Sequence, residues 1–88
     1  QHAEIDLILR KNDLLVFVEV KYRTNVQYGY PETAVNKRKQ QHLLKAVNFY
    51  LEQHRIESPI RCDIVAITEM ADGIDVLHLE DAWGYDLT

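Results

Sequence analysis

Apolar runs separated by short polar breaks cover most of this chain. The first two runs lie on either side of residues 11–13, and the second, residues 14–18, is rich in side chains that favour strands. Because Asn12 and Asp13 are residues that favour tight turns, the break predicts an antiparallel hairpin. The chain is therefore expected to begin with two paired strands.

A helical pattern follows from Asn36 to about His54, with Asn36 as a plausible N-cap. One face of this predicted helix carries residues spaced three or four apart, namely Gln40, Leu43, Leu44, Val47, Tyr50, Leu51 and His54. Residues 24–36 before the helix show no strong periodicity. They are expected to form either a plain connection or a flap whose Tyr28 and Tyr30 stack on bases.

Two further strands are predicted after the helix. Residues 61–67 follow Ser58-Pro59, and a turn at Asp72-Gly73 leads into residues 74–79. A helix between two strands of one sheet indicates a crossover connection and a parallel neighbour. The expected fold class is therefore α/β, a mixed β-sheet with one crossover helix.

Acidic residues and a lysine interrupt the first two apolar runs. Since side chains alternate along a strand, Glu4 and Asp6 share one face of the first run, and Glu19 and Lys21 share one face of the second. Pairing of the two strands brings these polar faces together. The opposite face, expected to point toward the core, carries Ile5, Leu7, Val16, Val18 and Val20.

Clustered carboxylates repel one another unless a cation lies among them. Mg²⁺ prefers oxygen ligands and is usually held by one or two carboxylates, so Asp6 and Glu19 fit this role and the Val20 carbonyl is a candidate third ligand. Lys21 would orient the attacking water or neutralise charge in phosphodiester hydrolysis. The alternative is a set of surface ion pairs, each contributing about 0 to 1 kcal/mol.

Residues 4–8 and 16–23, Glu-Ile-Asp-Leu-Ile and Val-Phe-Val-Glu-Val-Lys-Tyr-Arg, carry a resemblance. They look like the signature of the YraN-like bacterial family UPF0102, within the PD-(D/E)xK nuclease superfamily and similar to Holliday junction resolvases. The resemblance implies a restriction-endonuclease-like fold with Asp6 and Glu19 as metal ligands, Lys21 as the catalytic lysine, and Glu4 at a further acidic position of the signature.

The implied function is that of a Mg²⁺- or Mn²⁺-dependent endonuclease that hydrolyses DNA phosphodiester bonds, in branched or otherwise structured DNA. If the comparison with resolvases holds, two sites must cut two strands, so a homodimer is expected. Family members carry an N-terminal helix and a first strand ahead of the motif, and Gln1 stands only three residues before it. Residues 1–88 are therefore expected to be a single, N-terminally incomplete nuclease-like domain.

Basic residues provide a second candidate feature. Lys37, Arg38 and Lys39 occupy the first turn of the predicted helix, where the macrodipole disfavours cations unless an anion docks there. Together with Arg23 and Tyr28 they are the candidate nucleic-acid contacts; the alternative is a solvated basic cluster. The formal net charge is −4, but all ten Lys and Arg precede residue 63, which allows one half of the chain to face phosphate.

Composition narrows the remaining possibilities. No run reaches the roughly 20 apolar residues of a membrane span, so the cytosol is the expected location. Cys62 is expected to be a buried hydrophobe, Asp63 to brace Arg61 or another base, and the four histidines show no zinc spacing. Two other functions remain open: a nucleic-acid-binding module without useful turnover, and a protein-interaction domain that uses the acidic C-terminal part and Trp83.

Overall fold

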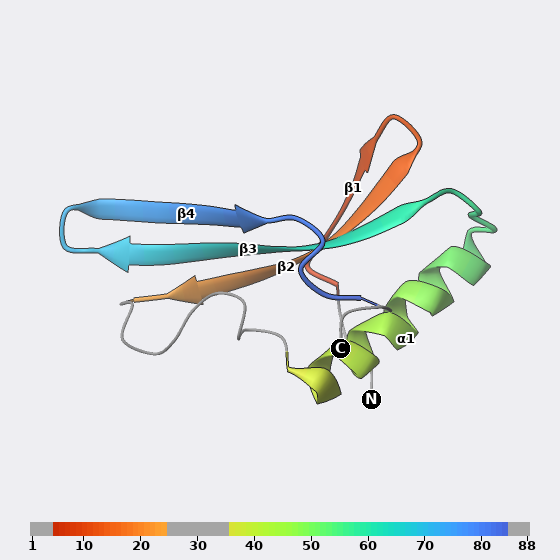
Figure 1. Ribbon diagram of the computed structural model, residues 1–88, viewed down its shortest axis with the longest axis horizontal. Helices are drawn as coiled ribbons and strands as arrows, with labels where there is room; N and C mark the ends of the chain where they lie inside the picture. Colours follow the sequence, from red (N-terminus) through yellow and green to blue (C-terminus); the bar gives the residue numbers. More distant parts are fainter. Residues whose placement is uncertain (1–4, 25–35, 85–88) are drawn as a thin grey trace.

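The computed structural model describes residues 5–24 and 36–84, which form a mixed sheet with one helix (Figure 1). In chain order the elements are β1 (Leu7–Lys11), β2 (Leu14–Arg23), α1 (Lys37–Gln53), β3 (Ile60–Met70) and β4 (Gly73–Leu79). The sheet order is β1-β2-β3-β4, in which the β2–β3 pair is parallel and the other two pairs are antiparallel. The predicted α/β class, mixed sheet and crossover helix are confirmed.

Local sequence explains where the elements begin and end. Asn12 takes a left-handed φ of 56° in the β1–β2 turn, a conformation that Asn tolerates better than most residues. Asn36 caps α1, and its Oδ1 accepts a hydrogen bond from the Lys39 N–H at 2.8 Å. The last hairpin differs slightly from expectation, since Gly73, at φ 152°, is already the first residue of β4.

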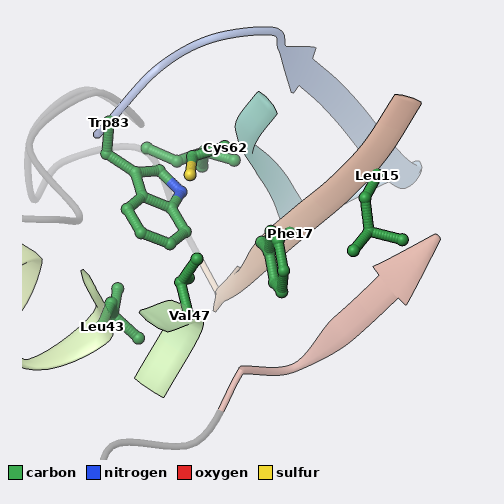
Figure 2. Packing of buried hydrophobic residues seen from close by; sticks show 7 residues of the cluster. Leu15, Phe17, Leu43, Val47, Cys62 and Trp83 are labelled. Atoms are coloured by element: carbon green, nitrogen blue, oxygen red, sulfur yellow. The ribbon is translucent and has the colours of Figure 1, made fainter. Parts of the chain in front are cut away.

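The hydrophobic core lies between α1 and one face of the sheet. Figure 2 shows Leu43 and Val47 of α1 facing Phe17 of β2, with Cys62 and Trp83 beside them. The Tyr50 ring packs edge-on against Phe17, with the ring centroids 5.8 Å apart. The helical face predicted from the sequence is therefore the face that packs on the sheet.

The position of this core corrects one prediction. The core was expected on the face opposite the carboxylates, yet α1 covers the face that carries Leu15, Phe17 and Glu19. Val16 and Val18 are also buried on the other face, whereas Leu7 is 47% exposed. Because β2 is central and apolar on both faces, its pattern does not alternate and gives no information about which side the helix covers.

The segment after β4 folds back onto the core. The Ala82 N–H donates to the Cys62 carbonyl oxygen at 2.8 Å, the Trp83 indole N–H donates to the Asp63 carbonyl oxygen at 2.8 Å, and Trp83 is 1% exposed. The Gln40 side chain donates to the Gly84 carbonyl oxygen, which ties this segment to α1. Trp83 is therefore a core residue and not an exposed contact for a partner.

Several predictions fall on residues outside the described ranges. These concern the role of Glu4 and the flap bearing Tyr28 and Tyr30. Within the described ranges, the single helix is neither long enough nor apolar enough to cross a membrane.

Candidate metal and phosphate site

Glu19 is a buried acidic side chain of the motif, whereas Asp6 is exposed. It lies on the central strand β2, on the face covered by α1, and only 6% of the residue is exposed. Its Oε2 forms an ion pair with Nζ of Lys39, which comes from the first turn of α1. A carboxylate buried to this extent is costly unless a cation is near, and Lys39 supplies that positive charge.

Asp6 lies beside the same stretch of β2. It immediately precedes β1, whose first residue, Leu7, pairs with Val18, so that Asp6 is one position further toward Glu19. Asp6 Oδ2 accepts a hydrogen bond from the Val20 N–H at 2.8 Å. The structure therefore places the two carboxylates predicted as metal ligands at neighbouring positions of the two strands.

Val20 and Lys21 complete this part of β2. The N–H and carbonyl of one strand residue point to the same side, so the Val20 carbonyl is directed toward the edge where Asp6 accepts the Val20 N–H. Lys21 is half-buried, and strand alternation places it on the face of Glu19. Asp6, Glu19, Val20 and Lys21 therefore occupy adjoining positions, as the sequence motif predicted.

The donor set fits one kind of metal ion better than others. In residues 5–24 and 36–84 there is no group of three or more His, Cys, Asp or Glu side chains able to hold a metal. Two carboxylates and a backbone carbonyl are hard oxygen donors of the sort that Mg²⁺ uses while keeping several water ligands. The Lys39 ammonium at Glu19 marks a position where this site already accepts a positive charge. The set matches Mg²⁺ or Mn²⁺ rather than zinc.

The basic residues at the start of α1 do not act as one group. Lys37 and Arg38 are exposed to solvent, whereas Lys39 is partly buried and turned toward Glu19. Arg23, at the end of β2, is half-buried, and Tyr28 lies outside the described residues. Sequence reasoning placed Lys39 among the phosphate contacts and missed its ion pair, because a contact between α1 and β2 leaves no signal in residue spacing.

Asp63 forms a separate polar network on the other face of the sheet. It pairs in register with Val18, so it points away from Glu19, and its carboxylate is completely buried. Four hydrogen bonds reach it: two from Arg61 at 2.9 Å, one from His78 Nε2 at 2.7 Å and one from the Asp81 N–H at 3.0 Å. The predicted bracing of Arg61 is confirmed, and the contacts with His78 and Asp81 were missed.

Burial and hydrogen bonding act in opposite directions on the pKa of Asp63. Burial raises this pKa, but the hydrogen bonds from Arg61, the Asp81 N–H and His78 together lower it below its ordinary value. The pKa of the neighbouring Cys62 thiol is raised to about 12, chiefly by burial. Cys62 is therefore a core residue without reactive character, as predicted.

The fold and the site define an α/β protein whose first hairpin places Asp6 beside Glu19, with Lys21 two residues further along β2. The family model described as Uncharacterised protein family UPF0102 matches residues 1–67, and the chain belongs to this family. A UPF0102 protein of Christiangramia forsetii is 36% identical over 85 residues, which cover 97% of this chain and 71% of that protein.

Two other relatives give the same result. A UPF0102 protein of Flavobacterium psychrophilum is 41% identical over 83 residues, covering 94% of this chain and 70% of the relative. A UPF0102 protein of Shewanella denitrificans is 42% identical over 78 residues, which cover 89% of this chain and 68% of the relative. The family predicted from the two-part acidic motif is thus confirmed.

Proposed function

We propose that this protein is a divalent-metal-dependent endonuclease that hydrolyses DNA phosphodiester bonds on a restriction-endonuclease-like fold of the PD-(D/E)xK type. The observation that carries the proposal is Glu19, a buried carboxylate on the central strand, with Asp6 on the adjoining strand and a cation at its oxygen. A carboxylate on a central strand is costly to bury, and the cation at Glu19 is a lysine from another element, 41% of whose side chain is exposed. The paired, fully hydrogen-bonded Asp63 provides the structural contrast within the same sheet.

The residues of the site divide the chemistry between them. Asp6, Glu19 and the Val20 carbonyl would hold a Mg²⁺ or Mn²⁺ ion, which supplies an acidified water and stabilises negative charge when bound. Lys21 orients the attacking water or neutralises charge on the phosphate. Glu4 is proposed as an additional acidic residue of the site on the family resemblance alone.

Exposed cations beside the site support a nucleic-acid substrate. Lys37 and Arg38 lie at the N-terminal end of α1, where the helix dipole also attracts anions, and the first turn contains no acidic residue. Arg23 and Tyr28 are proposed as further contacts with DNA. Preference for branched or structured DNA, and a homodimer with two cutting sites, rest on the similarity to resolvases, which is an analogy of fold.

The Glu19–Lys39 ion pair favours a second candidate function. A carboxylate that already has a lysine as its counter-ion is stable without a metal. The protein would then be a nucleic-acid-binding module that keeps the acidic motif without useful turnover. The two functions differ in whether a divalent cation displaces Lys39 and supports cleavage.

Cleavage and binding assays with the full-length protein separate these functions. Wild type, Asp6→Asn and Lys21→Ala would be titrated with Mg²⁺ or Mn²⁺ on branched, flapped and linear DNA. The nuclease proposal predicts cleavage by wild type that is lost in both variants, while Lys21→Ala still binds DNA. Tight binding by wild type with no cleavage at any metal concentration would establish the binding module instead.

A further inference from the structure

The contact between Lys39 and Glu19 joins the two parts of the proposed site. Lys39 belongs to the first turn of α1, beside the exposed cations, whereas Glu19 lies on β2 next to Asp6. One lysine therefore links the carboxylate predicted to hold a metal with the helix end predicted to meet phosphate. The two side chains differ in burial, since 41% of the Lys39 side chain is exposed and only 8% of the Glu19 side chain.

This difference in burial determines which partner can move. Glu19 is fixed on the central strand, between β1 and β3, and cannot leave its position without disturbing the sheet. The Lys39 backbone is held by its hydrogen bond to Asn36, but its ammonium is carried on a flexible four-carbon stem that already reaches solvent. Lys39 can therefore release Glu19 by rotating its side chain, with no change in the fold.

The Lys39 ammonium and a metal ion cannot bind the same carboxylate oxygen together. Two cations at one buried oxygen would repel strongly, so a divalent ion held by Glu19 must displace Lys39. A displaced Lys39 stays at the start of a 17-residue helix, the end at which the helix dipole attracts anions. A phosphate bound at this helix end would be within the same first turn as Lys39.

We propose that Lys39 is an exchangeable counter-ion of the site: it neutralises Glu19 when no metal is bound and, once a divalent cation displaces it, turns to a phosphate of the bound nucleic acid. This inference rests on the proposed function, because it assigns Glu19 to a metal. It makes Lys39 a positioning residue that couples the two ligands. Metal binding frees a cation for DNA, and DNA in turn favours the metal-bound arrangement by drawing Lys39 away from Glu19.

The test measures binding of Mn²⁺ to the full-length protein by calorimetry, in wild type, Lys39→Met and Lys39→Arg. Lys45→Met is the matched control, since Lys45 is an exposed lysine of the same helix. Removing the competing ammonium should tighten Mn²⁺ binding about tenfold in Lys39→Met, the factor that corresponds to roughly 1.4 kcal/mol. Lys39→Arg keeps a cation at Glu19 and should stay near wild type, as should Lys45→Met.

A second readout follows the phosphate contact. In Ca²⁺, used in place of Mn²⁺ to limit cleavage, Lys39→Met should bind branched DNA more weakly than wild type, whereas without metal the two proteins should bind alike. Unchanged or weaker Mn²⁺ binding by a folded Lys39→Met protein would overturn the exchange, as would equal DNA binding in Ca²⁺.

Cleavage assays on the same samples keep the two proposals apart. If wild type cleaves DNA but Lys39→Met does not tighten Mn²⁺, the exchange is wrong and the nuclease stands. If Lys39→Met tightens Mn²⁺ but wild type never cleaves, the exchange stands and the nuclease is wrong. Absence of Mn²⁺ binding in both proteins would overturn both.

Discussion

Substitution of Asp63 by asparagine should destabilise the fold by about 3 kcal/mol. Asparagine keeps the shape of the side chain and, through Oδ1, the bonds from Arg61 Nε and the Asp81 N–H. It loses the two bonds to Oδ2, from Arg61 Nη2 and His78. Hydrogen bonds to a charged group contribute roughly 1.5 to 3 kcal/mol each, so the loss of two gives at least about 3 kcal/mol.

Denaturant unfolding followed by fluorescence provides the assay, because the chain has one tryptophan, Trp83, which is buried and donates a hydrogen bond to the Asp63 backbone carbonyl. Glu80→Gln is the matched control. Glu80 also pairs with Arg61, but at 3.5 Å and with 62% of its side chain exposed, so its removal should cost less than about 1 kcal/mol.

The effect of Asp63→Asn should also depend on pH. The folded-state pKa of Asp63 is lowered, so its charge stabilises the fold fully above the unfolded pKa of about 3.9, and this stabilisation is lost as the pH falls through the folded pKa. The difference in unfolding free energy between wild type and Asp63→Asn should therefore be constant near neutral pH and shrink below about pH 4. A difference in unfolding free energy under about 0.5 kcal/mol at pH 7, or a difference that grows in acid, would refute this reasoning.

Three further predictions concern the core and the basic helix end. Cys62 is 3% exposed, and its pKa is raised to about 12. Its thiol should therefore resist thiol reagents at pH 8 in the native protein and react once the protein is unfolded. Rapid labelling of the native protein would contradict the place of Cys62 in the core. Leu43→Ala should lower the unfolding free energy by about 2 to 5 kcal/mol in the same denaturant assay, since Leu43 belongs to the core cluster with Trp83 and Val47. Lys45→Ala, on the exposed face of the helix, should lower it by less than about 0.5 kcal/mol. Changing Lys37 and Arg38 together to glutamine should reduce the slope of log K for DNA binding against log salt by almost two, about 0.9 per phosphate contact; an unchanged slope would remove both from the contact surface.

Local patterns were sufficient to predict the elements of the sheet and the helix. Asn12 and Asp13 predicted the first turn, Asn36 predicted the helix start, and the crossover rule predicted that β3 lies parallel to β2. Each of these features depends on residues close together in sequence or on a general rule of connection.

Long-range contacts were not predictable in the same way. Val16 and Phe17 are both buried, so the periodicity of β2 gave no basis for choosing the face that α1 covers. The ion pair of Glu19 with Lys39 and the hydrogen bond of Asp63 with His78 join residues 20 and 15 positions apart in different elements. Only the packing of α1 on the sheet, and the return of β4 beside β3, bring these side chains together.

The most direct test of the central claim is the rate at which full-length protein cleaves branched DNA as the Mg²⁺ concentration is raised, measured under single-turnover conditions for wild type and Glu19→Gln. The cleavage rate should saturate with Mg²⁺ in wild type and fall by about 10² or more in Glu19→Gln, because a transition-state stabilisation of roughly 2.7 kcal/mol is lost. Equal rates in the two proteins, or cleavage by wild type that does not depend on Mg²⁺, would contradict the assignment of Glu19 as a metal ligand.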